Sequence, residues 1–528
     1  MLKITINGIQ RRNSESKKHV LTANRAGPTH SHRNAAADQA GSATWLENYE
    51  YVVVGSGPGG GPLAARLAIA GFKVLLIDAG DDQGSTYQEQ VPGLTLQSTE
   101  YGPMKWDYFV NHYQDEAQQE QDSKMTWKTP TGDLHVGKGA PAGSTPLGIL
   151  YPRAGTLGGC SAHNALITVL SHESDWTNIA TLTGDFSWSP DNMQKYFEKL
   201  ERNRYLPSSI LGHGYTGWLG TALTSLTIVV EDLKLLSLVV SAATAMGKSL
   251  LGILINTVAG LGQVLLRDLN APGQVRKEGL YQVPLAMADS TRNGPRNFIL
   301  DTASATNSDG SRKYHLDVRL KTLVTKIRFT QNETSPKAVG VDFLDGQSLY
   351  GADPRSGSAS PTGSGSVNAT REVIISAGTF NTPQLLKLSG IGPKSELEKF
   401  GIPVLVDLPG VGTNLQDRYE TTVVGQADSD FVVTAACTFG KTPDPCLDQW
   451  INGPIQALKG VYASNGIAIA IVKKSSVASG DPDLFIAGAP AFFTVRTFPR
   501  ECGETVQVES VPRLLAHLYA PPEMAPKT

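Results

Sequence analysis

Cysteine is scarce in this chain. Its 528 residues include four, at positions 160, 437, 446 and 502. That number is too small for a fold built on disulfides. Cys437 and Cys446 flank a short turn-rich segment and could be joined in an oxidising compartment, but we expect free thiols.

A strong excess of charge of either sign is also missing. The formal net charge is -3, which gives no electrostatic basis for a nucleic-acid partner, and we expect no metal site. Charged residues make up 18% and hydrophobic residues 40% of the chain, as in an ordinary globular enzyme. The length predicts at least two domains, and the 54 glycines and 31 prolines favour a loop-rich α/β protein over a helical bundle.

The first residues, 1–44, lack the apolar core of a secretory signal peptide. They are basic and contain many Ser and Ala residues, as mitochondrial transit peptides do, but we favour a disordered extension. Cytoplasmic localisation is therefore the default expectation, and mitochondrial localisation is the alternative.

No long apolar run is uninterrupted. Residues 219–266 are the most apolar part, and Ser249–Leu266 approaches the length of a membrane span, but glycines, Asn256 and Gln263 interrupt it. We predict packed helices of a substrate domain. A membrane-surface patch is the alternative, and a true span is the least favoured interpretation.

Residues 50–80 carry the strongest functional signal. An apolar run at 51–54 leads into the glycine turn GSGPGG at 55–60, a helix-like run follows at 63–70, and a second apolar run at 74–77 ends in Asp78. Strand, glycine turn, helix, strand and acid in this order are typical of a dinucleotide-binding unit.

Each position in the turn has a physical task. Gly55 permits the tight turn, Gly57 lets the backbone approach a pyrophosphate, and Gly60 allows close packing of helix on strand. The amides of the helix N-terminus would face the phosphates, and Asp78 would accept hydrogen bonds from the ribose. The turn by itself is compatible with NAD, NADP or FAD.

Three further glycine-rich blocks follow in order. They are YPRAGTLGGCSAHN at 151–164, REVIISAGTFNTPQLL at 371–386 with SGIG at 389–392, and LPGVGTNLQDR at 408–418. Each alone could be packing glycines, but their order behind the first turn is much more specific.

With these blocks, the chain resembles the glucose–methanol–choline (GMC) family of flavin oxidoreductases. The signature PRxxxLGGxSxxN is matched at 152–164, and the signature SAGxxxTPxLLxxSGIG at 376–392. The resemblance runs from about Tyr51 to about Phe493 and implies an α/β fold: a Rossmann-like FAD-binding domain with a discontinuous α+β substrate domain. The expected division is a disordered extension at 1–44, an FAD-binding domain at 45–170 and 290–425, an incomplete substrate domain at 171–289 and 426–493, and an atypical tail at 494–528.

The resemblance implies FAD as the cofactor and oxidation of the CH–OH group of a small alcohol by hydride transfer to the flavin. The apolar segment 219–266 suggests a hydrophobic alcohol. The main chain at Leu323 and Val324 would contact adenine. The residues assigned to the cofactor are Gly55, Ser56, Gly57, Pro58, Gly60, Asp78, Ala79, Arg153, Gly158, Gly159, His163, Asn164, Val324, Ser376, Ala377 and Gly378.

His163 adds a finer expectation. The string GGCSAHN is similar to the choline-oxidase branch of the family, in which the matching histidine is covalently attached to the flavin. A covalent link between His163 and FAD is therefore one hypothesis. A histidine packed beside the flavin and hydrogen-bonded to backbone is the alternative.

The catalytic residues stay unassigned. The family's base is a histidine in a C-terminal segment, and residues 494–528 show neither that motif nor strand alternation. His517 is the only late histidine and its surroundings do not match, while Arg418 stands where the family more often has histidine. Other candidates for the base are poor ones: His163, His172, His213 and Asp417.

Three functions follow from this. The first is the family's alcohol oxidation. The second is a shortened chain that lost the catalytic element and only binds flavin. The third is a membrane-surface protein that uses residues 219–266.

Overall fold

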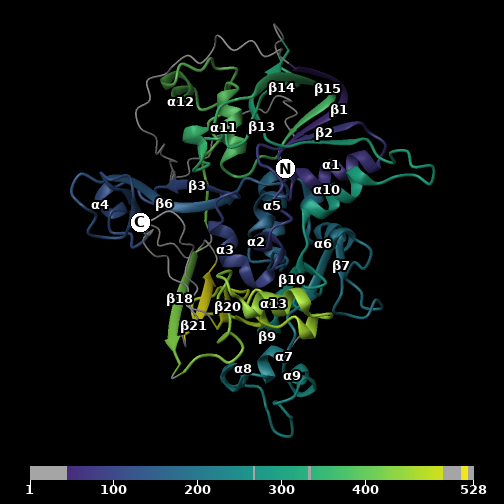
Figure 1. Cartoon of the computed structure of the whole chain (residues 1–528), viewed down its shortest axis with the longest axis vertical. Coiled ribbons are helices and arrows are strands. Elements are labelled where there is room, and N and C mark those ends of the chain that lie inside the picture. Colours follow the sequence, from purple (N-terminus) through teal and green to yellow (C-terminus); the bar gives the residue numbers. More distant parts are fainter. Residues whose placement is uncertain are drawn as a thin grey trace.

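The computed structural model describes residues 44–490 except 266–267, 331–334, 418 and 428, and it describes the backbone alone at 419–426 and 513–520. The extension expected at 1–44 lies outside the described residues apart from Thr44. Figure 1 shows one large sheet in the upper half of the molecule and a second group of strands in the lower half.

The upper sheet has six strands in the order β12-β2-β1-β15-β14-β13. The first four strands in this order run parallel to one another. The fifth, β14, pairs antiparallel with both β15 and β13. This doubly wound arrangement confirms the Rossmann-like prediction. The strands are β1 (Thr44–Val54), β2 (Val74–Ile77), β12 (Leu316–Arg319), β13 (Thr322–Phe329), β14 (Ala338–Asp345) and β15 (Gly363–Ile375).

Helices cover both faces of this sheet, which explains why its central strands are apolar on both sides. α1 (Gly60–Ile69) and α10 (Pro295–Ser304) lie side by side on one face, where Ala64 and Ala68 pack with Ile299. Leu385 of α11 (Asn381–Leu388) packs on the other face. Small alanines on α1 let the helix lie close to the strands, so the turn before it is held firmly.

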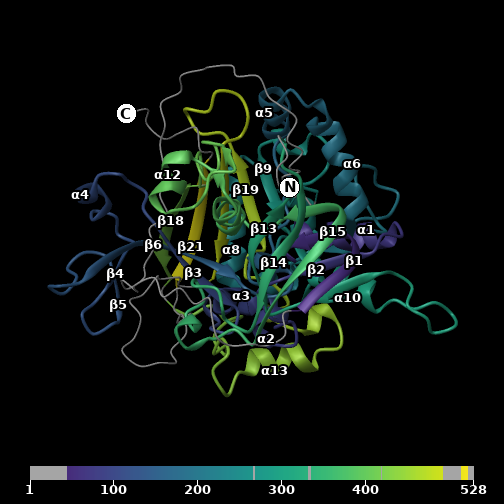
Figure 2. The ribbon, with the colours of Figure 1, turned by 90° about the horizontal axis from the view of Figure 1, so that it is seen from above.

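The segment between β2 and the second glycine block, residues 82–154, folds into structure of its own. It forms an antiparallel sheet in the order β3-β6-β4-β5, which projects from the body at the left of Figures 1 and 2. Strand β6 leads directly into the second glycine block. The elements are α2 (Tyr87–Gln90), α3 (Thr95–Glu100), β3 (Lys105–Val110), α4 (Glu116–Gln119), β4 (Met125–Lys128), β5 (Leu134–Val136) and β6 (Thr145–Ala154).

Two further sheets build the lower half, in the orders β11-β10-β8-β7 and β18-β21-β20-β19-β9. Their strands are β7 (Glu201–Asn203), β8 (Leu219–Leu223), β9 (Gly279–Gln282), β10 (Pro284–Ala288), β11 (Thr291–Arg292), β18 (Tyr419–Gln426), β19 (Ile469–Lys473), β20 (Leu484–Ala489) and β21 (Arg513–Ala520). The remaining elements are α5 (Glu173–Thr183), α6 (Pro190–Leu200), α7 (Thr227–Val230), α8 (Leu233–Ala245), α9 (Val258–Val264), β16 (Ile391–Gly392), α12 (Lys394–Lys399), β17 (Val406–Asp407) and α13 (Pro445–Asn452).

The apolar segment 219–266 forms β8 and the helices α7, α8 and α9, which pack together through residues such as Val229, Val239 and Leu261. Packed helices were the expectation. Within the part of the chain that the structure describes, no helix is long and apolar enough to cross a membrane.

Two expectations were wrong. The tail at 494–528, in which apolar and polar residues do not alternate as in a strand, nevertheless contributes β21. This strand lies between β18 and β20, so pairing with these two strands explains it better than its own residue pattern does. Cys437 and Cys446 form a disulfide instead of two free thiols. The limits of the two domains stay predictions.

Candidate functional site

The first glycine turn joins β1 to α1 and leaves no room for a side chain at Gly55 or Gly60. Gly55 has φ +99°, and a Cβ there would lie 2.3 Å from the Ser376 carbonyl oxygen. A Cβ on Gly60 would lie 2.1 Å from the Gly55 carbonyl oxygen. No side chain caps the first turn of α1, so its amide groups are presented to a ligand. A helix N-terminus of this kind suits an anionic group such as a pyrophosphate.

Asp78 follows β2 and holds this turn in place. Its carboxylate accepts hydrogen bonds from Ser56 N (2.8 Å), Ser56 Oγ (2.6 Å) and Gly80 N (2.8 Å). Burial raises the pKa of Asp78, although these hydrogen bonds oppose the rise. Three of about four acceptor positions are thus used inside the protein. One acceptor position is left, and the contact of Asp78 with a ribose hydroxyl stays a prediction.

The second block lies against the first. Gly158 N donates to Ser56 Oγ at 3.0 Å. Gly158 and Gly159 both have positive φ, and a Cβ on Gly159 would lie 2.8 Å from the Cα of Gly57. Two segments that are a hundred residues apart in sequence therefore meet backbone to backbone. One cavity of about 160 Å³ is lined by residues of both blocks and of later parts of the chain. These residues are Pro58, Ser161, Asn164, Ile167, Thr168, Trp218, Leu219, Ala286, Asn293, Gly294 and Pro295.

The third block closes the turn from the other side. Ser376 N donates to the Val54 carbonyl at 2.8 Å, and Ala377 N donates to Thr382 Oγ1 at 3.0 Å. Gly378 has φ +98°. The buried Oγ of Ser376 has no hydrogen-bond partner among the described residues. An unpaired hydroxyl beside the turn is suited to a polar ligand group, because buried polar atoms are normally paired.

The predicted contact with adenine concerns β13 and the residues around Ala79. Thr322 N donates to the Asp78 carbonyl at 3.0 Å, which places the first residue of β13 beside the acid. Val324 is two residues further along and packs on the core of the sheet. Ala79, Asp81, Trp106 and Tyr350 lie around a small cavity at the same edge. The main-chain contact of Val324 with adenine stays a prediction.

His163 is 5% exposed, and its Nδ1 has no partner among the described residues. Burial, together with the nearby positive charges of Arg292 and Arg153, lowers the pKa of His163 to about 3. The imidazole is therefore neutral. Arg153 itself lies over the rings of Phe380 and Tyr151, at 5.4 and 5.9 Å from their centres.

Arg292 is a site residue that the sequence did not reveal. Its guanidinium donates to the carbonyls of Ser161 and Asn164 and to Asn164 Oδ1. The arginine comes from β11 and its acceptors from a loop about 130 residues earlier, so no local pattern links them. An arginine after an apolar strand is a weak signal, because such residues are usually solvated.

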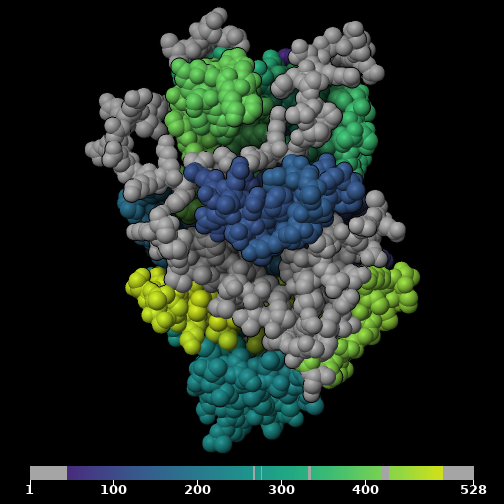
Figure 3. All heavy atoms as spheres, turned by 90° about the vertical axis from the view of Figure 1, so that its left-hand side faces the viewer, coloured from purple at the N-terminus to yellow at the C-terminus, as the bar shows by residue number. Residues whose placement is uncertain are grey.

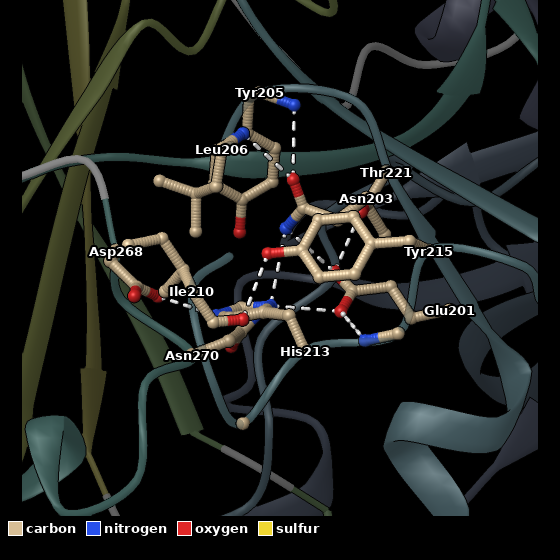
Figure 4. A network of polar contacts seen from close by, with 12 residues as sticks. Glu201, Asn203, Tyr205, Leu206, Ile210, His213, Tyr215, Thr221, Asp268 and Asn270 are labelled. Carbon is tan, nitrogen blue, oxygen red and sulfur yellow. Dashed lines mark hydrogen bonds and ion pairs between the residues drawn. The ribbon is translucent and has the colours of Figure 1, made fainter. Parts of the chain in front are cut away.

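The other candidate bases are dispersed. His172 caps α5 through Ser174, and Asp417 accepts a hydrogen bond from the Tyr151 hydroxyl at 2.5 Å. His213 lies in a separate buried network of the lower half (Figure 4), between Glu201 and Asp268. Arg418 and the side chain of His517 lie outside the described residues. No candidate is paired with a second histidine in the described part.

A family model described as GMC oxidoreductase matches residues 133–420, more than half of the chain. A second model, an NAD(P)-binding Rossmann-like domain, matches residues 53–112. The chain is 28% identical to an alcohol dehydrogenase [acceptor] of Pseudomonas putida over 395 residues, which cover 74% of this chain and 57% of the relative. It is 31% identical to the ecdysone oxidase of Spodoptera littoralis over 382 residues, which cover 70% of this chain and 50% of the relative.

Among solved structures, the fold is similar to a formate oxidase of Aspergillus oryzae RIB40, with a TM-score of 0.63 and 18% sequence identity. That match covers 91% of this chain and 73% of the other. At this identity the likeness concerns the fold alone. The chain spans little more than half the length of the curated relatives that it matches.

Proposed function

The chain belongs to the GMC oxidoreductase family, and we propose that it is an FAD-dependent oxidoreductase that removes a hydride from the CH–OH group of a small alcohol. One observation carries the proposal: the turns at 55–60, 158–164 and 376–378 meet at one edge of the sheet, and Ser376 Oγ and His163 Nδ1 are buried there without a partner among the described residues. FAD would supply hydride acceptance at its flavin ring.

The residues of the chain bind and orient the cofactor. The first turn of α1 faces the pyrophosphate, and Asp78 offers its remaining acceptor position to the ribose. Gly158 and Gly159, which lack side chains, let a flat ring approach the backbone. The sheet β3-β6-β4-β5 and the loop around Tyr350 cover the nucleotide end, since the rings of Trp106 and Tyr350 lie 4.8 Å apart there.

We further propose that His163 is the attachment point of a covalently bound FAD. A nucleophilic imidazole must be neutral, and the low pKa of His163 keeps it so near neutral pH. Nδ1 has no partner among the described residues and is open to a bond with the flavin, whereas a packed histidine that donates to backbone would have to use Nε2.

The lining of the cavity beside Pro58 supports an alcohol that is mainly apolar. Trp218, Leu219 and Ala286 give it an apolar side, and Ser161, Asn164 and Asn293 give it a polar one. A carbinol with a hydrocarbon body matches such a mixed wall.

Association with a membrane surface is a second candidate function. Leu251 and Leu254 are 95% and 72% exposed, and they lie in the segment between α8 and α9 at the far end of the molecule (Figures 1 and 3). Isolated exposed leucines are common, but several at one tip without acidic side chains are typical of an interaction surface.

The proposed reaction is tested with the purified full chain. The visible spectrum is recorded aerobically, and then a panel of primary and secondary alcohols of increasing chain length is added without oxygen. A flavin spectrum that bleaches with an apolar alcohol supports the enzyme. Flavin that stays bound and is bleached by no alcohol supports a chain that only binds flavin. A folded protein that binds no flavin contradicts both proposals.

A further inference from the structure

The guanidinium of Arg292 is buried beneath the loop 158–164. Nη1 donates to Ser161 O (3.0 Å), Asn164 O (2.8 Å) and Asn164 Oδ1 (2.8 Å), and Nε donates to Glu89 O (2.8 Å). Nη2 lies 3.4 Å from Thr95 Oγ1, and that hydroxyl donates in turn to Asn164 O at 2.7 Å. A single side chain thus holds Ser161 and Asn164, the residues on either side of Ala162 and His163.

A tight hairpin places Arg292 there. β10 and β11 are joined by Asp289 and Ser290, which both have positive φ although neither is glycine. Turns of this shape match the twist of the two strands. Trp450 of α13 donates from Nε1 to the Ser290 carbonyl at 2.9 Å and supports the turn. Arg292 lies opposite the fully buried Met287 in the hairpin, so its side chain has few alternative positions.

In the described part of the chain, the charge of Arg292 has no bidentate carboxylate partner. The acid whose charge acts on it is Glu89, which is buried and has Oε2 unpaired among the described residues. Burial raises the pKa of Glu89 to about 7 and lowers the pKa of Arg292 to about 10. A buried charge is costly unless hydrogen bonds satisfy it, and here the acceptors are backbone carbonyls and an amide of the loop.

We propose that Arg292 is a positioning residue that holds loop 158–164 in the conformation in which His163 and Asn164 face the cofactor. The hydrogen bonds themselves are independent of any ligand, and only the identity of the ligand rests on the proposed function. Because Asn164 Oδ1 accepts from both Arg292 and Leu166 N, the same contact also fixes where the chain leaves the loop.

Arginine is required for this task. The acceptors lie on two sides of the planar group, and a guanidinium offers five donors in a rigid fork. A lysine ammonium is a point charge on a flexible stem, so it can reach one or two of these acceptors but not all of them.

The test compares Arg292→Lys with Arg312→Lys in the full chain as purified, without added FAD. Arg312 pairs with Asp317 at the opposite, amino end of the parallel strands, where both side chains are partly exposed. Hydrogen–deuterium exchange is followed in peptides that cover 158–168 and 322–329. Arg292→Lys is expected to speed exchange in 158–168 by about tenfold and to leave 322–329 unchanged, because only local opening becomes easier. Arg312→Lys is expected to change neither peptide.

A second variant, Trp450→Phe, keeps the apolar ring but removes the donor to the Ser290 carbonyl. It is expected to speed exchange in 158–168 by a smaller factor without touching the loop. Unchanged exchange in 158–168 for both variants, or equal acceleration in every peptide, would overturn the proposal.

A separate titration with FAD distinguishes the two proposals, and it uses the flavin-free His163→Asn background, in which no covalent cofactor fills the site. If this protein binds FAD, adding Arg292→Lys is expected to weaken binding by about tenfold, or about 1.4 kcal/mol. If it binds none and the purified wild-type protein carries none, the proposed function fails, while the exchange data still decide the role of Arg292.

Discussion

At the scale of single residues, His163 combines a buried unpaired nitrogen with a pKa of about 3. A neutral, desolvated imidazole is ready to act as a nucleophile, so we expect the purified protein to carry FAD on His163. Peptide mass spectrometry would show the adduct on the His163 peptide. The variant His163→Asn should release its flavin on denaturation, whereas Cys160→Ser, which changes the neighbouring free thiol, should retain it. Yellow protein with an unmodified His163 peptide would rule out the link.

His213 is the residue whose charge matters for stability. Its Nδ1 lies 2.8 Å from Glu201 and its Nε2 lies 2.9 Å from Asp268, and the imidazole is fully buried (Figure 4). Burial alone would lower the pKa of His213, but the hydrogen bonds to Asp268 and Glu201 outweigh it and raise the pKa to about 9. Tyr205 and Tyr215 lie beside this network, and their pKa values are raised, so both stay protonated in the same range.

The sign of the pH effect follows from this shift. A histidine with a raised pKa in the folded state stabilises the protein fully below its unfolded value of 6.5, and the stabilisation is lost as the pH rises through about 9. The shift corresponds to roughly 3 kcal/mol. We expect the melting temperature to fall between pH 6.5 and 9.5 in the wild-type protein and much less in His213→Gln. Equal falls in both proteins, measured by scanning calorimetry, would show that His213 does not govern this range.

At the scale of elements, the disulfide between Cys437 and Cys446 ties the start of α13 to the preceding loop. The two residues are 9 apart in sequence, and closing so short a loop in the unfolded chain is expected to stabilise the fold by about 2–3 kcal/mol. We therefore expect a phosphine reductant to lower the melting temperature of the wild-type protein and to leave that of Cys437→Ser/Cys446→Ser unchanged.

Thiol counting provides the control for this bridge. Denatured, unreduced protein should show no more than two free thiols out of the four cysteines in the sequence, because Cys437 and Cys446 are bridged. Four free thiols would contradict the bridge. Such a disulfide persists mainly in oxidising compartments, so the count also tests the cytoplasmic expectation.

The same elements show what the sequence can and cannot predict. The unit β1–α1–β2 and the turn at Gly55 were predictable, because strand, turn and helix are encoded within thirty neighbouring residues. The strand β21 was not, since it forms between β18 and β20, which are distant in sequence. Arg292 was missed for the same reason: its acceptors are Glu89, Ser161 and Asn164, and only the folded chain brings them together.

At the scale of the whole molecule, the cofactor edge and the tip between α8 and α9 lie far apart (Figure 1). The described tip residues from 245 to 259 include one charged side chain, Lys248, and no acid. Leu251, Leu254 and Val258 are exposed there, at 95%, 72% and 39%. A lysine beside exposed leucines suits a bilayer with anionic headgroups, because its stem can lie along the acyl boundary while the ammonium reaches the phosphates.

We therefore expect the full chain to bind vesicles that contain an anionic phospholipid more tightly than zwitterionic vesicles. Leu251→Ser/Leu254→Ser should weaken this binding by about tenfold or more, since each buried leucine contributes roughly 1.5–3 kcal/mol. The matched control is Leu182→Ser/Leu211→Ser, which removes two leucines that are 89% and 90% exposed but lie away from the tip. Flotation on a density gradient measures the bound fraction.

If both double variants bind as the wild type does, the tip is not the membrane contact. If instead the wild type sediments as a dimer that only Leu251→Ser/Leu254→Ser dissociates, the tip joins two copies of the chain and the membrane proposal fails.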